Sequence, residues 1–174
     1  MIVWSAGRPL VWSDFRGPVD PDAPPRTAAS TSSSLTLGYE LEVRQDRRCT
    51  FVITSIETLA TFEPSASWVK PGQRTAEVLE HEQGHFDITQ VHKMIPDREA
   101  RGLVGDERRC PSGAAMEAIQ ARAAAIVAEV RDRVWADLRD VQERYDAETA
   151  HGTQRAAQRE WSARIEEALR RGRW

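Results

Sequence analysis

An apolar row at helical spacing runs through the C-terminal half of the chain. Its members are Ile119, Ala123, Ile126, Val130, Val134, Leu138, Val141 and Tyr145. Intervals of three and four residues keep these side chains on one face of an α-helix for about seven turns. Because the segment is rich in alanine and lacks regularly placed flanking charges, we expect this helix to pack within its own domain instead of forming a coiled-coil arm. Ser112 is its expected N-cap residue.

Two shorter segments have the same helical period. The first begins at the N-cap candidate Thr75 and extends to about Met94, where Pro96 is expected to end or kink it. The second covers residues 154–171, in which apolar side chains recur one turn apart. Three helices are therefore predicted after residue 70.

The N-terminal part of the chain has a period of two. From Leu35 to Val43, apolar and polar residues alternate, which predicts a half-buried strand. The β-rich run 49–62 predicts a hairpin partner and a following strand. Residues 18–34 contain four prolines and no aliphatic period, so we expect a long loop with short edge strands. These patterns predict one α+β domain over residues 1–174, with an N-terminal antiparallel sheet followed by the three helices.

Charge and composition exclude several classes of protein. The chain has 24 basic and 27 acidic side chains, so no overall positive charge is available to drive nucleic-acid binding. The longest apolar run, 123–128, is far shorter than the ~20 residues of a membrane span. Arg8 and Pro9 precede any apolar stretch of signal-peptide length, so no export signal is expected in this chain. Cys49 and Cys110 can form one disulfide or remain two thiols, and only a disulfide favours an oxidising compartment.

Candidate catalytic chemistry is concentrated in the sequence His-Glu-Gln-Gly-His at residues 81–85. His81 and His85, at positions i and i+4 of a helix, project from one face and can bind one Zn²⁺. Glu82 then lies beside the metal, where it can act as the general base that takes a proton from a metal-activated water. The segment is preceded and followed by apolar residues at helical spacing, which supports its placement on a helix.

A third ligand is needed for a catalytic zinc site, and it does not lie in the same helix. In metzincins a glycine and a third histidine follow the second histidine by three and six residues, but Ile88 and Val91 occupy those positions here. His92 lies seven residues after His85, about 10 Å along a continuous helix, so we expect it in the core or on the surface.

The remaining ligand candidates lie far along the chain. His151 is favoured because it stands on a glycine-containing turn after the long helix, from which a side chain can be directed back toward a neighbouring helix. The alternatives are the glutamates of the long helix, with Glu148 next in order and the others at Glu117, Glu129 and Glu143.

Several strings of residues together resemble a known bacterial family. They are residues 12–17 (Trp-Ser-Asp-Phe-Arg-Gly), 67–68 (Ser-Trp), 81–88 (His-Glu-Gln-Gly-His-Phe-Asp-Ile), 145–152 (Tyr-Asp-Ala-Glu-Thr-Ala-His-Gly) and 158–161 (Gln-Arg-Glu-Trp). The chain resembles the predicted secreted zinc-dependent proteases catalogued as domain of unknown function 922, in the zincin-like metallopeptidase clan. The resemblance covers about residues 10–165. It implies a zincin-like fold, peptide-bond hydrolysis and a periplasmic or secreted location.

These patterns predict a zinc-dependent metallopeptidase acting on a peptide or protein. Tyr145 is a candidate donor to the oxyanion of the reaction, although it also completes the apolar row and can simply pack in the core. Asp87 points away from the expected metal face, so we expect it to anchor the helix or support a ligand. The alternative functions are a zinc-stabilised adaptor that cuts no peptide and a metal-free helical interaction module.

Overall fold

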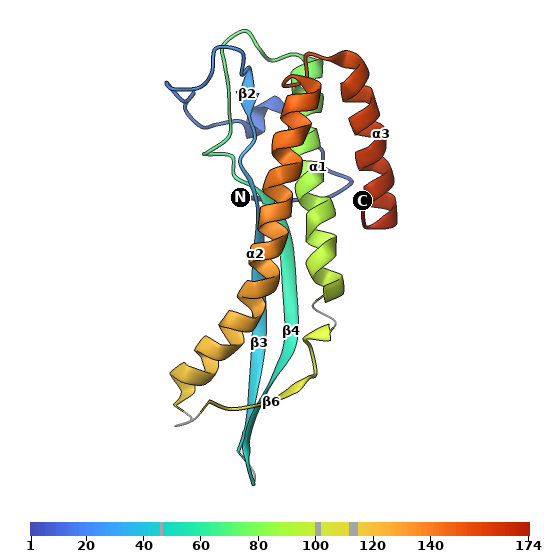
Figure 1. Ribbon diagram of the computed structural model, residues 1–174. Coiled ribbons are helices and arrows are strands. Elements are labelled where there is room, and N and C mark those ends of the chain that lie inside the picture. Colours follow the sequence, from blue (N-terminus) through green and yellow to red (C-terminus); the bar gives the residue numbers. More distant parts are fainter. Residues whose placement is uncertain (46, 100–101, 112–114) are drawn as a thin grey trace.

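Two long antiparallel strands form the centre of the fold. The computed structural model describes residues 1–45, 47–99, 102–111 and 115–174 (Figure 1). Strands β3 (Ser33–Gln45) and β4 (Cys49–Phe62) pair along their whole length, which confirms the predicted hairpin. The prediction of two strands within residues 49–62 is wrong. A one-residue register shift after Glu40 accommodates a bulge within the pair, so β4 continues without a break.

Short strands complete the sheet and form a second, smaller one. β1 (Ile2–Val3) and β6 (Glu107–Arg109) both pair antiparallel with β4. β2 (Ala29–Ser30) pairs separately with β5 (Trp68–Val69), so the proline-containing loop does include a short strand. A single 3-10 turn, η1 (Trp12–Asp14), lies in the N-terminal segment.

Three helices follow, as predicted. α1 (Ala76–Glu99) packs on β4, and α2 (Met116–Thr149) runs antiparallel to α1 and contacts β3 (Figure 1). α3 (Arg155–Arg171) returns along both helices. Among the described residues, none of the helices combines the length and apolar character needed to span a membrane.

The helix ends partly match their sequence signals. Thr75 caps α1, since its hydroxyl accepts a hydrogen bond from the backbone N–H of Val78 at 3.2 Å. The predicted end of α1 near Met94 is wrong, because the helix continues through Pro96 to its last residue, Glu99. A proline this close to a helix end removes few intrahelical hydrogen bonds. The expected cap Ser112 lies outside the described residues.

The apolar row of α2 forms the core beneath the sheet. Its buried members within the described chain are Ile119, Ala123, Val130, Val134, Val141 and Tyr145, with Val127 buried where Ile126 is only partly so. These side chains pack against residues of β3, β4 and α1. The prediction that the helix packs within its own domain is therefore confirmed.

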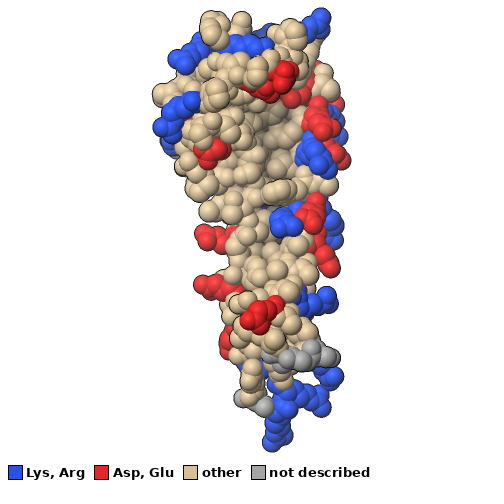
Figure 2. All heavy atoms as spheres, turned by 90° about the vertical axis from the view of Figure 1, so that its left-hand side faces the viewer, with Lys and Arg blue, Asp and Glu red and all other residues tan. Residues whose placement is uncertain are grey.

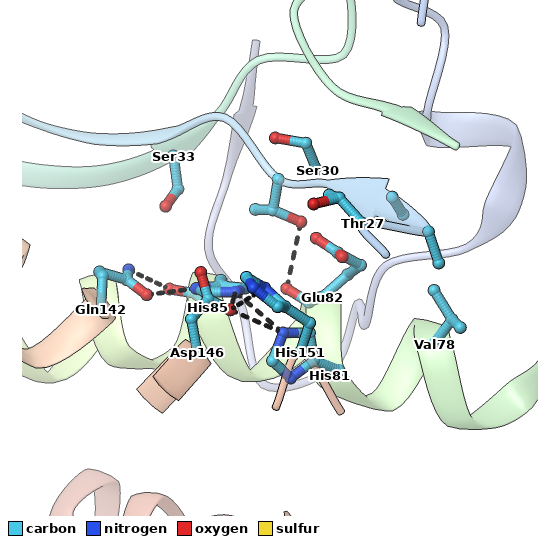
Figure 3. A pocket seen from close by; sticks show the side chains of 13 residues that line it. Thr27, Ser30, Ser33, Val78, His81, Glu82, His85, Gln142, Asp146 and His151 are labelled. Atoms are coloured by element: carbon cyan, nitrogen blue, oxygen red, sulfur yellow. Dashed lines mark hydrogen bonds and ion pairs between the residues drawn. The ribbon is translucent and has the colours of Figure 1, made fainter. Parts of the chain in front are cut away.

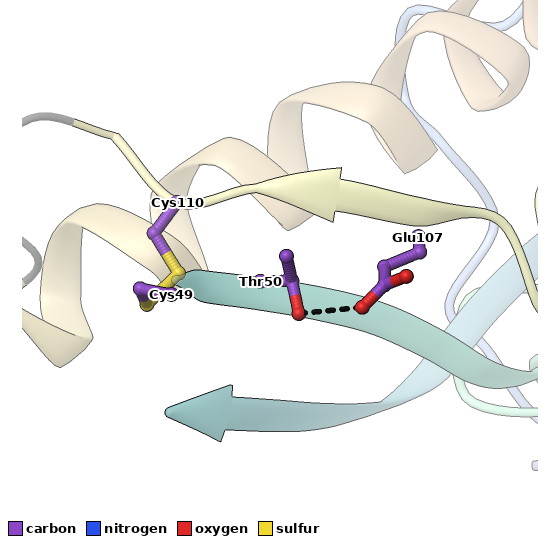
Figure 4. The surroundings of a disulfide bond; sticks show 4 residues. All are labelled: Cys49, Thr50, Glu107 and Cys110. Atoms are coloured by element: carbon purple, nitrogen blue, oxygen red, sulfur yellow. Dashed lines mark hydrogen bonds between the residues drawn. A yellow bond between two sulfur atoms is a disulfide. The ribbon is translucent and has the colours of Figure 1, made fainter. Parts of the chain in front are cut away.

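A disulfide fixes the connection that leads into α2. Cys49, the first residue of β4, is bonded to Cys110, which directly follows β6 (Figure 4). The backbone of Cys110 donates a hydrogen bond to Cys49 at 3.1 Å, and Thr50 donates one to Glu107 at 2.7 Å. Of the two possibilities left open by the sequence, the structure thus contains the bridged pair, which is typical of proteins from oxidising compartments.

Candidate metal centre

Two histidines of α1 and one carboxylate of α2 converge at the wall of a cavity (Figure 3). The Nε2 atoms of His81 and His85 lie 3.2 Å apart. Oδ1 of Asp146 lies 3.0 Å from each of these nitrogens. The antiparallel course of the two helices brings the end of α2 beside the beginning of α1 (Figure 1).

The ring orientation of His85 is fixed by Gln142, one turn before Asp146. The side-chain Nε2 of Gln142 donates a hydrogen bond to the backbone oxygen of His85 at 2.8 Å. The amide oxygen of Gln142 consequently faces Nδ1 of His85 and accepts a hydrogen bond from it. With its proton on Nδ1, the imidazole directs the lone pair of Nε2 toward Asp146.

His81 is oriented in the same way by α3. Tyr145 donates its hydroxyl proton to the backbone oxygen of His81 at 3.1 Å, and Nε2 of Gln158 donates to the tyrosine oxygen at 2.7 Å. The remaining amide atom of Gln158, its oxygen, lies 3.1 Å from Nδ1 of His81 and accepts its proton. Both helix histidines therefore present unprotonated Nε2 atoms to the carboxylate.

Three lone-pair atoms thus face one another and require a cation or a proton between them. Ligands about 2.0–2.1 Å from a tetrahedral Zn²⁺ lie about 3.3 Å from one another. The three observed separations among His81, His85 and Asp146 are 3.0–3.2 Å. The donor set and its spacing therefore fit a metal ion.

His151 also reaches this cluster. Its Nδ1 lies 3.2 Å from Oδ1 of Asp146, and the ligand atoms of His81, Asp146 and His151 all lie within 4.8 Å of one another, a grouping that could hold a metal ion. The turn that positions it contains three successive residues with positive φ, at 150–152. Gly152 is required there, because a Cβ atom at this position would lie 2.9 Å from Cβ of His81.

Asp146 is the residue that sequence reasoning missed. It lies between His151 and the helix histidines in space, and no local pattern distinguishes it from the other acidic residues of α2. Glu148 instead accepts a hydrogen bond from the Trp161 indole at 2.8 Å. The other glutamate candidates of α2 are exposed; they are Glu117, Glu129 and Glu143.

The pKa values of Asp146 and His85 show which charge the cluster favours. Burial alone would raise the pKa of Asp146. Without a metal, a proton on Nε2 of His81 or His85 makes the imidazole a hydrogen-bond donor to Asp146, and these bonds outweigh burial and hold that pKa far below its usual range. Burial would lower the pKa of His85, yet the nearby carboxylates of Asp146 and Glu82 raise it above its ordinary value. The cluster therefore favours a positive charge, which a proton or a metal cation can supply.

Glu82 is close to the cluster but makes no ion pair within it. Its side chain is 3% exposed, and Oε2 is buried without a hydrogen-bond partner among the described residues. The carboxylate points into the cavity toward residues 27–30, which form the opposite wall (Figure 3). The cavity has a volume of about 340 Å³. A carboxylate oxygen without a partner there is available to accept a proton from a ligand.

Tyr145 has a different environment from that of an oxyanion donor. It is fully buried, its ring stacks on that of His81 with centroids 4.6 Å apart, and its hydroxyl bonds to His81 and Gln158. The cavity lining does not include it. These contacts favour the packing role that the apolar row had also indicated.

Gln83 and Asp87, the remaining polar residues of the segment 81–88, anchor α1 to the N-terminal segment. Oε1 of Gln83 accepts a hydrogen bond from the backbone of Leu10 at 2.7 Å, while Asp87 accepts one from Gln83 and one from the Trp4 indole, each at 2.7 Å. This matches the helix-anchoring role expected for Asp87. His92 was expected either in the core or on the surface, and it lies fully buried in the core. Its Nδ1 lies 2.8 Å from the backbone oxygen of Ile88, to which it is hydrogen-bonded.

Comparison of this chain with protein-family models, curated proteins and solved structures gave no match. The resemblance noted from residues 81–88 and 145–152 therefore stays a prediction.

Proposed function

We propose that this protein is a zinc-dependent metallopeptidase of the zincin-like type suggested by its sequence motifs. The main support is the convergence of His81, His85 and Asp146 near Glu82, whose carboxylate oxygen Oε2 has no hydrogen-bond partner among the described residues. Imidazole and carboxylate ligands are typical of zinc, and three protein ligands leave a coordination position open, as catalysis requires.

Each residue then has a defined role. Bound Zn²⁺ would supply a Lewis acid that polarises the peptide carbonyl. His81, His85 and Asp146 hold the ion, and the two glutamines keep the imidazoles in the ligating tautomer. Glu82 takes a proton from the attacking water as its oxygen bonds to the carbonyl carbon, and delivers that proton to the leaving amine as the C–N bond breaks.

Glu82→Gln tests this proposal directly. The amide keeps the shape of the side chain but cannot accept the proton, so hydrolysis of an unstructured protein should fall by ~10²-fold or more while zinc content is unchanged. Glu77→Gln, an exposed change in the first turn of the same helix, should leave hydrolysis unaffected. Equal rates for wild type and Glu82→Gln would refute the assignment of the base.

A zinc-stabilised adaptor is the second candidate, and the position of His151 is the observation that favours it. If His151 were a fourth ligand, the coordination shell would be closed, as in structural zinc sites. In the catalytic arrangement His151 lies beside Asp146, with Nδ1 3.2 Å from Oδ1, and does not bind the ion.

Zinc affinity measurements distinguish these two arrangements. Loss of a ligand should weaken binding by more than the ~10- to 100-fold typical of residues that only support ligands. The catalytic arrangement predicts such a loss for Asp146→Asn but the smaller change for His151→Ala. Comparable large losses in both variants would favour the adaptor. Asp140→Asn, an exposed change on the same helix, is the matched control.

A further inference from the structure

A second cavity adjoins the candidate metal centre. It has a volume of about 500 Å³ and lies between the beginning of β3 and the middle of α2. Ser33 and Gln142 line both this cavity and the one at the metal centre, so the two are neighbours across these two side chains. Figure 3 shows Ser33 and Gln142 together at one end of the metal-centre cavity.

The junction between the two cavities is held in place by a buried threonine. Thr89 of α1 lies 2.7 Å from the Ser33 hydroxyl and accepts a hydrogen bond from Gln142 at 3.3 Å. Gln142 is also bonded to His85. The side chains between the two cavities are thus hydrogen-bonded to one another and, through Gln142, to the candidate ligand His85.

The second cavity is lined by large apolar side chains from both elements, and also by the charged residues Asp132 and Arg139 of α2. Leu35 of β3 is buried, Leu138 of α2 is partly buried, and Trp135 of α2 remains 47% exposed. On the face shown in Figure 2, uncharged side chains form a band along the middle of the molecule, and charged side chains lie mainly along its edges. An exposed tryptophan beside a cavity is a common binding contact for an apolar ligand.

We propose that this cavity, with Trp135 as its main contact, binds a large apolar side chain of the extended polypeptide whose peptide bond lies at the metal centre. Asp146 follows Trp135 by eleven positions, or about 16 Å along the helix at 1.5 Å per residue. An extended peptide rises about 3.3 Å per residue. The apolar side chain therefore lies about five residues from the cleaved bond. This inference rests on the proposed function, because it names the substrate class of that site.

Cleavage-site profiles test the proposal. Wild-type protein with zinc, acting on a mixture of peptides of known sequence, should select large apolar residues four to six positions from the cut on one side. Trp135→Ala should reduce that selectivity about tenfold, the size expected for a lost apolar contact. Met116→Ala, an equally exposed change at the far end of the same helix, should keep the wild-type profile. Cleavage without this preference, or a preference that survives Trp135→Ala, would overturn the proposal.

A binding experiment separates failure of this inference from failure of the proposed function. Zinc-loaded Glu82→Gln is titrated with a dodecapeptide containing one phenylalanine, and with the same peptide carrying serine in its place. Binding of the first with a change in tryptophan fluorescence that disappears in Trp135→Phe supports the cavity, even if the wild type hydrolyses nothing. Absence of such binding, or self-association of the protein that is lost in Trp135→Ala, overturns it.

Discussion

The amide oxygen of Gln158 lies 3.1 Å from Nδ1 of His81, although the two residues are 77 positions apart in the sequence. Through this contact α3 takes part in the candidate metal centre without contributing a ligand. The same glutamine donates to Tyr145, which in turn donates to the backbone of His81, so a closed set of hydrogen bonds determines which ring nitrogen faces Asp146.

Replacing Gln158 should weaken metal binding without removing a ligand. In Gln158→Leu the proton of His81 loses its acceptor, and the ring is no longer held in the ligating tautomer. We expect zinc affinity to fall by about 10- to 100-fold, measured by competition with a chelator of known affinity. Gln154→Leu, an exposed change at the beginning of the same helix, should have little effect. Unchanged affinity in Gln158→Leu would contradict the role given to this residue.

Gly84→Ala should destabilise the protein, against the usual effect of alanine in a helix. Alanine normally stabilises a helix interior by about 1 kcal/mol relative to glycine. Here a Cβ atom at residue 84 would lie 2.2 Å from the hydroxyl of Tyr145, so the ring must move and its hydrogen bonds break. We expect a net loss of about 1–3 kcal/mol in the free energy of unfolding, measured with denaturant. The loss should shrink in the Tyr145→Phe background, where the nearest clashing atom is absent; equal losses in both backgrounds would rule out this explanation.

Reduction of the disulfide should lower stability substantially. The bond between Cys49 and Cys110 spans 61 residues of sequence. Closing a loop of that size restricts the unfolded chain and contributes roughly 4 kcal/mol to the free energy of unfolding. Denaturant unfolding with and without a reductant measures this difference. The Cys49→Ser, Cys110→Ser double variant is the control, since reductant should not change its stability. A wild type indifferent to reductant would show that the bond contributes little.

His92 should make stability depend on pH. Burial lowers its pKa below the ordinary value, and this outweighs the opposing effects of the Ile88 carbonyl and Asp137. Because its folded-state pKa is lower than the ~6.5 of the unfolded chain, the unfolded state binds more protons as the pH falls below that value. Stability should therefore decrease with falling pH, by up to about 1.4 kcal/mol per pH unit, until the folded-state pKa is passed.

Denaturant unfolding of metal-free protein between pH 7.5 and pH 5, in roughly half-unit steps, tests this expectation. The other histidines contribute equally to the pH dependence of stability in wild type and in His92→Gln. The difference in pH dependence between the two proteins therefore isolates the contribution of His92. Nε2 of His92 lies 3.2 Å from an Asp137 oxygen outside hydrogen-bonding geometry, and Asp137 is unchanged in both proteins. If the free energy of unfolding depends on pH identically in wild type and His92→Gln, burial of this ring does not contribute to that dependence.

Local periodicity was sufficient for most of the secondary structure. The spacing of apolar residues predicted the three helices and the β3–β4 hairpin, because helix and strand periods are properties of neighbouring residues. It failed within residues 49–62 and at Pro96. Strand β4 stays unbroken over residues 49–62 because it pairs with β3 along that whole length. Helix α1 continues past Pro96 to Glu99.

Local sequence spacing was enough to specify one half of the candidate site. His81 and His85 share a helix face because 3.6 residues make one turn, so their proximity follows from local geometry alone. The other half, comprising Asp146, Gln142 and Gln158, depended on how α2 and α3 align with α1. Within α2, Asp146 differs from other acidic residues only in lying opposite the two histidines. That position is set by packing between helices distant in sequence, and so are the pairing of Cys49 with Cys110 and the junction at Ser33.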